Sequence, residues 1–495
     1  MQKLKSIGCM IFCGSQTIGN MLAGFEPDRI LEISEEIINQ NAYHFIKNYP
    51  NIPVITPNTW ENDEYLNGLK KENYDLLYAN NPCSGLSSLV KTASVDNPTN
   101  IHFYRVTNAI SKIQPKVFFM ENAPTAINLG YPILLDLFNK LNDIYNFTVI
   151  KDKAGNHGVA MERNRTFIIG WRKDVFSNKV PLVEMNLQPF TSVKDIIGEY
   201  YNVPVGTSED INHVCLPEKD RDFSNAEHLL CHIKQGQNFL DFLMENFDLY
   251  KNEITEKQAD GVMRAKKKVA KGGRLWNKSP YRVPENGHAP SMSSVIQLIH
   301  PIENRHFTIR EYGLLMGYPK TFIFYPEAKV DVIQAISQGV PAKYIEYIHS
   351  EIREALNGNR ELQDLNGSIL EFRNHISKLH RFYSLEDLNS AKKFEVTHKN
   401  EKLTKSELIA KIAEIVELPK SDVNLTINAL VSIIISEMQI GHEITIPGLG
   451  TFLKQHKSER IATNPLTGQK IKIPSKNVPK FKAAKNLKEA VGLTQ

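Results

Sequence analysis

The first third of the chain, residues 6 to 172, alternates short apolar runs with amphipathic stretches. Short apolar runs between polar residues are typical of buried strands, and apolar positions three or four residues apart are typical of helices that pack on a sheet. Their alternation predicts a parallel sheet with crossover helices. The predicted strands are Ile7–Phe12, Arg29–Ile33, Pro53–Ile55, Tyr74–Tyr78, Val117–Met120, Phe147–Ile150 and Thr166–Gly170, and the clearest helices are Ile101–Ile113 and Pro132–Tyr145.

The regular pattern weakens after about residue 175 and returns at Phe307–Pro319 and Val332–Leu356. A chain of 495 residues is too long for one core and suits two or three domains. We therefore expect a catalytic domain over 1–175, a smaller target-recognition region over 176–300, a return to the catalytic domain over 301–356 and a polar, mostly helical connector over 357–402.

The last part of the chain, residues 403–495, has its own pattern. Thr404 and Glu407 have the spacing of a capping box at the start of a helix, and a second helical run covers Lys420–Ile440. Ile444–Phe452 then predicts a strand, a glycine turn and another strand, and Asn464–Gly468 predicts the tip of a hairpin between basic arms. This order predicts a separate α+β domain with a β-ribbon arm.

Composition indicates a soluble protein, with 41% hydrophobic and 23% charged residues and no apolar stretch that we expect to span a membrane. The basic and then apolar segment Met1–Gly14 has no small-residue cleavage site, which favours a first buried strand over a signal peptide. Five scattered cysteines favour reduced thiols. The expected compartment is the cytoplasm.

Charge is uneven along the chain, although the net charge is only +4. The last hundred residues carry an excess of about five positive charges. A second basic cluster covers Arg264–Arg274, which is either a solvated loop or helix face or a contact with phosphates.

Residues with reactive or ionisable side chains lie at the ends of three of the predicted strands. Cys83 lies in a loop just after one strand, Glu121 ends the next, and Arg163 and Arg165 stand where a third begins. Loops at the carboxyl edge of a parallel sheet are where α/β proteins build their sites. A thiol and a carboxyl group are thus expected to meet there, with one guanidinium pointing inward and one outward.

These pieces, in this order, resemble the DNA (cytosine-5)-methyltransferase family over about residues 5–356. Pro82-Cys83 matches the Pro-Cys of its nucleophile loop, Glu121-Asn122 its acid motif, and Arg163 and Arg165 its arginine motif. Further matches are Phe12-Cys13-Gly14, Ala23-Gly24-Phe25, Glu32, His300-Pro301 and Thr308–Pro319. The resemblance implies a Rossmann-like α/β domain with a mixed sheet.

The resemblance also implies a mechanism. Cys83 as a thiolate would add to C6 of cytosine while Glu121 protonates N3, which activates C5 for transfer of a methyl group. Arg165, with Arg163 beside it, would hold the base or its phosphate. The target base would have to leave the duplex to reach Cys83.

S-adenosylmethionine is the donor that the resemblance implies. The residues expected to bind it are Phe12, Gly14, Ser15, Gln16, Thr17, Glu32, Asn58, Pro82 and Gln338. Several positions depart from the family pattern. Gln16 and Thr17 replace glycines of the donor turn, and Asn58 lies near the place where the family has an acidic residue. Asn81 and Ser84 replace the residues that usually flank the nucleophile. Two interpretations stay open: a divergent but ordinary methyltransferase, or an enzyme that uses a variant of the donor and installs another group.

Residues 403–490 resemble the HU/IHF family of bacterial DNA-bending proteins. In that family a proline at the arm tip, here Pro465, wedges between base steps. The resemblance implies a homodimer or pairing with a separate HU-like protein, double-stranded DNA as partner, and a nucleoid-associated place in a bacterial or phage-infected cell. The expected DNA contacts are Lys454, Lys457, Arg460, Asn464, Pro465, Lys470, Lys472, Lys480, Lys482 and Lys485. Ala462-Thr463 departs from the family, which usually has an arginine before Asn-Pro.

Three alternatives remain at this stage. The chain could be an architectural DNA-binding protein whose methyltransferase-like part is not catalytic, or it could modify RNA, which the HU-like part makes less favourable. A zinc site is a third. Its candidate ligands are His213, Cys215, His228, Cys231 and His232, whose spacing fits no standard finger, so we expect no metal.

Overall fold

The computed structural model describes residues 4–36, 42–81, 85–86, 94–127, 129–206, 209–215, 224–270, 279–292, 297–326, 331–390, 405–416, 420–463, 470–473 and 475–490. The chain divides into two compact units. One comprises Met1–Val262 and Asn277–Thr397, and the other includes His398–Gln495. Each is described by itself.

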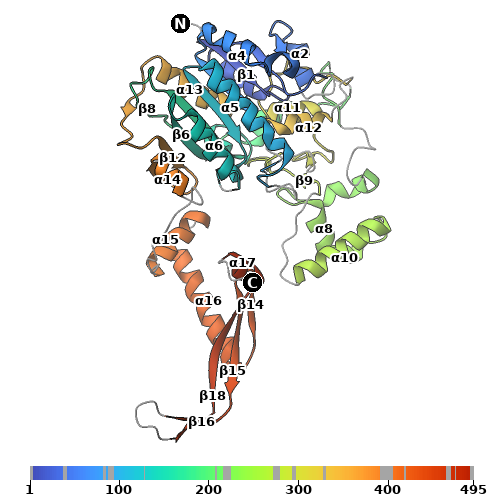
Figure 1. Cartoon of the computed structure of the whole chain (residues 1–495). Coiled ribbons are helices and arrows are strands. Elements are labelled where there is room, and N and C mark those ends of the chain that lie inside the picture. The colour runs from blue at the N-terminus through green and yellow to red at the C-terminus, as the bar shows by residue number, and fades with distance from the viewer. Residues whose placement is uncertain are drawn as a thin grey trace. The chain divides into compact units, whose positions relative to one another are not determined.

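A nine-stranded sheet forms the centre of the first unit (Figure 1). Its order is β13-β12-β6-β7-β5-β4-β1-β2-β3. Neighbouring strands are parallel except that β7 runs antiparallel to β5 and β6, and β13 antiparallel to β12. The strands are β1 (Leu4–Cys9), β2 (Phe25–Leu31), β3 (Val54–Ile55), β4 (Leu76–Asn80), β5 (Val117–Asn122), β6 (Tyr145–Lys153), β7 (Asn164–Arg172), β12 (Leu370–Asn374) and β13 (Leu379–Tyr383).

All seven strands predicted from the apolar runs are present in this sheet, with their ends shifted by a few residues. The two predicted helices also form, as α5 (Ile101–Ile113) and α6 (Tyr131–Leu141). The central strands β4 and β5 are buried along their whole length, because helices cover both faces of the sheet. The antiparallel β7 makes the sheet mixed, as the family resemblance implied.

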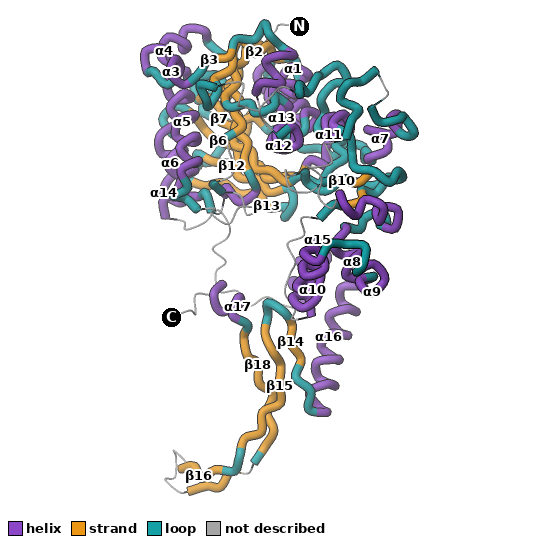
Figure 2. Tube along the Cα trace, turned by 90° about the vertical axis from the view of Figure 1, so that its right-hand side faces the viewer, coloured by secondary structure: helices purple, strands orange, loops and turns teal. Residues whose placement is uncertain are grey.

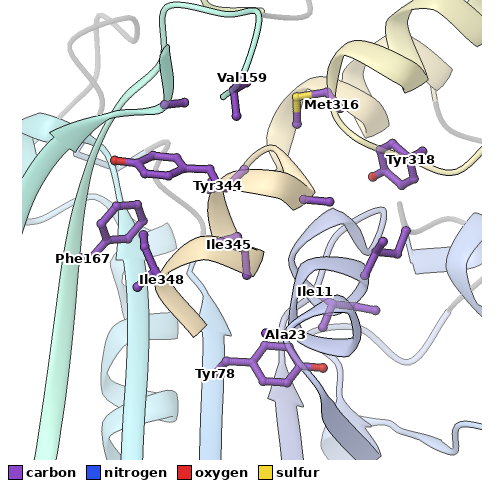
Figure 3. Packing of buried hydrophobic residues seen from close by; sticks show 14 of the residues in the cluster. Ile11, Ala23, Tyr78, Val159, Phe167, Met316, Tyr318, Tyr344, Ile345 and Ile348 are labelled. Atoms are coloured by element: carbon purple, nitrogen blue, oxygen red, sulfur yellow. The ribbon is translucent and has the colours of Figure 1, made fainter. Parts of the chain in front are cut away.

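Two hydrophobic clusters hold the helices against the sheet, one on each face. Figure 2 shows the helices on either side of the strands, and Figure 3 shows Tyr344, Ile345 and Ile348 beside Tyr78 and Phe167. Helices of the first face are α1 (Ser15–Leu22), α2 (Ala42–Asn48), α7 (Val193–Ile197), α11 (Ile309–Leu315), α12 (Val332–Gln338) and α13 (Ala342–Leu356). Helices of the second face are α3 (Pro57–Trp60), α4 (Asp63–Leu69), α5, α6 and α14 (Leu385–Ser390).

The expectation of a mostly helical connector over 357–402 is wrong for its described part. β12 pairs in parallel with β6, and β13 extends the sheet by one antiparallel strand. Leu370 and Phe372 are fully buried in the second cluster. The segment is polar because alternate residues of β13 are more exposed, and this period of two is that of a strand rather than of a helix.

The region over 176–300 is mostly irregular, with a small helical cluster of its own. Leu229, Phe239, Leu243 and Val262 are among the residues of this cluster. Its elements are η8 (Ser224–His232), α8 (Phe239–Glu245), α9 (Phe247–Tyr250) and α10 (Glu256–Ala270), followed by the short parallel pair β9 (Tyr281–Arg282) and β10 (Leu298–Ile299). Two further short strands, β8 (Val180–Pro181) and β11 (Leu362–Gln363), pair antiparallel. The basic cluster forms the exposed end of α10 as far as the structure describes it.

The second unit has the predicted order of two helices followed by strands. Its elements are α15 (Lys405–Val416), α16 (Lys420–Ile440), β14 (Ile444–Ile446), β15 (Gly450–Lys457), β16 (Arg460–Thr463), β17 (Lys470–Ile473), β18 (Lys476–Ala483) and α17 (Lys485–Ala490). β15 pairs antiparallel with β14 and β18, and β16 pairs with β17.

One feature of α16 corrects an expectation from composition. Among the described residues, its segment Asp422–Ile440 is long and apolar enough to cross a bilayer, and only 6% of that segment is buried. Length and composition alone are weak evidence for a membrane span, because helices of soluble assemblies share them. The described residues of this chain nevertheless leave a large apolar surface of the segment uncovered.

A buried histidine in α13 makes the first unit sensitive to acid. The Asn20 amide donates to Nδ1 of His349 at 3.0 Å, since the Oδ1 of Asn20 already accepts from Ser6. Burial lowers the pKa of His349 to about 3, from 6.5. The unfolded chain therefore binds a proton that the folded chain excludes, so this stabilising contribution is complete above pH 6.5 and declines as the pH falls towards 3.

We expect His349→Leu to remove that part of the acid sensitivity. Between pH 6.5 and 5.5 the wild-type free energy of unfolding should fall by about 1 kcal/mol more than that of the variant. Urea unfolding at the two pH values measures the difference. Equal pH slopes for the two proteins would contradict the assignment of a neutral, buried His349.

Candidate active site

The carboxyl edge of the central strands gathers the polar groups of the site. In the register of β4 and β5, Asn80 lies opposite Glu121. Because β7 runs antiparallel, its first residues lie beside the last residues of β5, with Asn122 opposite Thr166. Residues two apart on a strand share a face, so Glu121 and Arg165 both point to the face that carries α13.

Glu121 and Arg165 form an ion pair between their carboxylate and Nε atoms. Arg165 also donates from Nη1 to the Asn164 carbonyl at 2.8 Å. Burial raises the pKa of Glu121, against the opposing pull of Arg165 and Arg163. A carboxyl group with a raised pKa holds a proton at higher pH than usual, which suits it to donate a proton to a substrate atom.

Arg163 has a different place from the one expected. Its guanidinium donates to three backbone carbonyls, those of Met292 at 2.9 Å, Ser337 at 2.7 Å and Gly339 at 2.5 Å. The expectation of one arginine inward and one outward is wrong, because residues two apart on a strand share a face and both side chains are largely buried. Arg163 is thus a positioning residue that ties β7 to two distant segments of the unit.

The nucleophile candidate Cys83 and its neighbour Pro82 lie outside the described residues. The chain reaches them from β4, and the last described residue before them is Asn81, which is 1% exposed. Asn122 of β5 donates to the Asn81 carbonyl at 3.4 Å. The loop that carries Cys83 therefore begins next to the strand that carries Glu121.

The donor turn joins β1 to α1. Gly14 caps α1 with a φ of 94°, and a Cβ there would lie 2.2 Å from the Phe45 ring, so glycine is required. Phe12 is half-buried and adopts a φ of 50°. Ser15, Gln16 and Thr17 form the first turn of α1, and all three are fully buried.

The side chains of Gln16 and Thr17 are directed towards β4. The Gln16 amide donates to the Ala79 carbonyl at 3.4 Å, and Thr17 Oγ1 accepts from the Tyr78 hydroxyl at 3.1 Å. Glycines at these two places would leave that space open. The substitutions therefore connect the donor turn to the strand that leads to Cys83.

A second part of the expected donor site lies at the ends of β2 and β3. The carboxylate of Glu32 accepts from the Ile11 and Ile33 amides at 3.1 and 3.4 Å, and burial raises its pKa to about 7. Next to it, a hollow of about 740 Å³ is lined by residues that include Ile33, Pro57 and Asn58. The backbone N–H of Asn58 donates to Oε1 of Glu35 at 2.5 Å.

These residues fit the donor that the sequence implies. The hollow has room for an adenosine group, and its lining includes Ile33, which directly follows the buried Glu32, and Asn58. Gln338 ends α12 and is half-buried, and the neighbouring Gly339 approaches α1 so closely that a Cβ there would lie 2.2 Å from Ser15 Oγ. The expected donor residues thus come from five parts of the chain, residues 12–17, Glu32, Asn58, Pro82 and Gln338, and Pro82 alone lies outside the described residues.

Sequence reasoning missed several groups beside the site. Asn80 and Asn81 are buried amides directly before the nucleophile loop; Asn81 was predicted only as a departure from the family pattern, and two amides after an apolar strand were the available signal. On the other side of Arg165, the Asp152 carboxylate accepts a hydrogen bond from His157 Nε2 at 2.6 Å. The His157 ring stacks on Tyr344, whose hydroxyl is buried without a hydrogen-bond partner among the described residues.

The five scattered His and Cys residues do not form a visible cluster. His213 contacts the Val203 carbonyl, Cys215 donates to the His306 carbonyl, and His228 pairs with Glu253. Within the described residues no group of three or more potential ligands meets. Each of these side chains has a structural contact instead.

The expected DNA contacts of the second unit are spread over both faces of the β15 and β18 ribbon. Lys480 and Lys482 are exposed and lie opposite Leu453 and Thr451, so they share one face. Lys454 lies opposite Pro479 on the other face and donates to the Gln439 carbonyl at the end of α16. Lys485 is exposed in α17.

The remaining contacts lie in the arm. Arg460, Lys470 and Lys472 belong to β16 and β17, and Lys457 ends β15. Asn464 and Pro465 lie outside the described residues. Their contacts with DNA stay predictions.

Comparisons with known proteins agree with the two-part architecture. The family model for C-5 cytosine-specific DNA methylase matches residues 11–354, and the model for bacterial DNA-binding protein matches residues 403–492. Over 301 residues the chain is 23% identical to type II methyltransferase M.FnuDI of Fusobacterium nucleatum, covering 57% of this chain and 77% of that protein. Over 89 residues it is 40% identical to DNA-binding protein HU-beta 2 of Neisseria meningitidis, covering 18% and 98%.

A solved structure shares the fold of the larger part. It is described as a DNA modification methyltransferase encoded within a prophage of E. coli, and it is 24% identical with a TM-score of 0.50, covering 72% of this chain and all of that one. The chain therefore belongs to the C-5 cytosine-specific DNA methylase family, as a DNA cytosine-5-methyltransferase whose residues 403–492 belong to the bacterial DNA-binding protein family.

Proposed function

We propose that the first unit transfers a methyl group, or a variant of it, to C5 of a cytosine that has left the DNA duplex, with Cys83 as nucleophile. The observation that carries this proposal is the buried Glu121–Arg165 pair beside the strand that leads to Cys83. Cytosine C5 is too weakly nucleophilic to react alone, so addition of the Cys83 thiolate to C6 is needed to make it reactive. The thiol leaves again once the C5 proton has been lost.

Glu121 delivers the proton that this addition requires. Burial raises its pKa, which favours the protonated carboxyl group that can donate to N3 of the cytosine as negative charge develops there. Arg165 holds Glu121 in place and offers its remaining guanidinium donors to the base or its phosphate. Arg163 acts one step further away, by fixing the segments around Met292 and Gly339.

S-adenosylmethionine, or a variant of it, supplies an electrophilic carbon on a positively charged sulfur. Gly14 and the first turn of α1, Glu32 and the hollow beside Asn58 would hold it. Both interpretations of the donor that the sequence left open agree with these residues.

The test of this function is the mass of nucleosides from DNA treated with the full chain and the donor. We expect a deoxycytidine that carries the added group. We expect no added group when the cytosines of the DNA substrate are already blocked at C5. Unmodified DNA with the protein still bound would instead support an architectural role, and modification of RNA alone would contradict a DNA substrate.

For the second unit we propose that a second HU-like fold completes its core. Among its described residues, only four apolar side chains are buried: Ile409, Ala413 and Val423, which form one cluster, and Leu453. By contrast, α16 exposes a row of apolar side chains, with Leu425 at 67%, Ile433 at 56% and Ile440 at 69% exposure. Apolar surface of this extent marks an interface with another chain. A second copy of this chain is the partner that we propose.

Self-association gives a prediction about mass in solution. Light scattering of the full chain should give twice the 56.3 kDa of one chain, and Ile433→Asp should halve that mass by placing a charge in the proposed interface. Leu187→Asp is the matched control, because Leu187 is 76% exposed in the first unit. A wild-type protein with the mass of one chain would favour pairing with a separate HU-like protein.

A further inference from the structure

A second buried carboxylate lies beside Arg165, and no step of the proposed reaction uses it. Asp152, near the end of β6, is 1% exposed. Its carboxylate accepts at least three hydrogen bonds, of which the one from His157 Nε2 to Oδ2 is 2.6 Å long. His157 is also 1% exposed, and its Nδ1 has no hydrogen-bond partner among the described residues. A protonated ring would leave that second N–H buried without an acceptor, so the contacts favour a neutral His157 and a charged Asp152.

The register of three strands places this carboxylate on the same face of the sheet as Glu121 and Arg165. Asp152 and Arg165 are directly opposite each other in the antiparallel pair of β6 and β7, where side chains share a face and Cβ atoms are about 5 Å apart. Glu121 lies opposite Phe167, which is two residues beyond Arg165 and therefore shares its face. Tyr344 of α13 covers this place, with its ring 5.1 Å from that of Phe167 (Figure 3). Arg165 thus lies between two carboxylates.

The other titratable and charged groups around Arg165 come from each neighbouring element. Among the described residues they are Arg163 on β7, His157 in η5 (Ala154–His157), Tyr344, Tyr347 and His349 on α13, and His375 after β12. Burial raises the pKa of both tyrosines and lowers the pKa of His349 and His375, so these four side chains are uncharged at neutral pH. The charged groups are therefore the guanidiniums of Arg163 and Arg165 and the carboxylates of Glu121 and Asp152.

We infer that Asp152 is a second counter-ion of Arg165, held in place by His157, which leaves Glu121 free to carry the proton that cytosine N3 receives. This inference rests on the proposed function and makes Asp152 a positioning residue that acts through Arg165. If Glu121 were the only carboxylate beside two guanidiniums, their charge would favour its ionised form, which cannot donate a proton. Asp152 offsets that charge across the buried sheet, so the burial of Glu121 can raise its pKa against the pull of the arginines.

The first test measures whether the two carboxylates replace each other at Arg165. Glu121→Gln and Asp152→Asn each leave Arg165 one counter-ion, whereas the double variant leaves it none. The free energy of unfolding should therefore fall by more in the double variant than by the two single losses added together. Urea unfolding of the full chain, followed by the fluorescence of the buried Trp60 and Trp171, measures all four proteins. Additive losses would overturn the inference, and this measurement needs no transfer activity.

The second test follows the rate of a single turnover of transfer to DNA against pH. Glu121 loses its proton as the pH rises, so the wild-type rate should fall on the alkaline side. In Asp152→Asn the charge of Arg165 is no longer offset, so Glu121 ionises at lower pH. This fall should move down by about one pH unit, with the affinity for DNA changed less than about threefold. Asp152→Leu combined with His157→Phe replaces the buried pair by apolar groups, which such sites often tolerate, and should move the fall equally.

Glu371→Gln is the matched control. Glu371 is a fully buried carboxylate that pairs with Arg373 on β12, two strands from β7, and its loss should leave the alkaline fall at the wild-type pH. A fall at the wild-type pH in both Asp152 variants would overturn the inference. A shift in Tyr344→Phe without one in Asp152→Asn would also overturn it, because the effect would then belong to the hydroxyl. A chain that shows the excess loss of stability but transfers no group at any pH would contradict the proposed function and leave the charge pairing standing.

Discussion

Replacing Cys83 with alanine is expected to reduce transfer to DNA by about 10⁴-fold or more, because C5 of cytosine is not activated without the covalent bond at C6. The initial rate of label transfer from donor to DNA measures this effect. Binding of DNA should change little, since the second unit contributes its own contacts. The loss should therefore appear in kcat rather than in KM.

The control for this experiment is another thiol of the same chain. Cys231 is exposed, so Cys231→Ser should keep the wild-type rate. Transfer at a wild-type rate by the Cys83→Ala protein would remove Cys83 from the mechanism. Loss of activity in both variants would point to a general effect of thiol replacement.

The second large effect concerns stability. Arg163→Met is expected to lower the free energy of unfolding of the first unit by about 3–5 kcal/mol, because it leaves three backbone carbonyls without their donor in a buried place. Urea unfolding, followed by the fluorescence of the buried Trp60 and Trp171, measures the change.

Arg172→Met provides the comparison. Arg172 ends β7, is only partly buried, and donates to a single backbone carbonyl, that of Gln114. We expect it to cost less than about 1.5 kcal/mol. An Arg163→Met protein with an unchanged unfolding midpoint would show that the three carbonyl contacts do not hold the segments together. A midpoint change equal to that of Arg172→Met would remove the special role of Arg163.

The sheet was predictable because its strands are buried on both faces. Strands such as Val117–Asn122 must be apolar throughout, and a short apolar run bounded by polar residues is a strong signal. The antiparallel direction of β7 could not be predicted from its apolar run, because such runs look alike in parallel and antiparallel strands. The family resemblance supplied the mixed sheet.

The missed features depend on contacts between distant segments. β12 is added to the edge of the sheet by pairing with β6, more than two hundred residues earlier, and β13 pairs in turn with β12. No local pattern reveals the pairing of β12 with β6. Arg163 was placed with the substrate because its spacing from Arg165 is the family's, whereas its partners lie at Met292 and Gly339. Every residue has a backbone carbonyl, so the sequence does not indicate which of them accept from Arg163.

The candidate site was predicted in its residue types more than in its geometry. Glu121 and Arg165 were both predicted as site residues, and their ion pair forms because β5 and β7 are neighbours and their ends coincide. The expected meeting of Glu121 with Cys83 stays a prediction. The amides of Asn80 and Asn81 became informative only once their burial and missing partners were known.

Covalent trapping is the measurement that tests the central claim most directly. DNA that carries 5-fluorocytosine cannot lose a proton from C5, so the thiol cannot leave after transfer. We expect the full chain and donor to form an adduct with this DNA that survives denaturation and whose mass places the bond at Cys83, and we expect none with Cys83→Ser. An absence of adduct with the wild-type chain, or an adduct at another residue, would contradict the account.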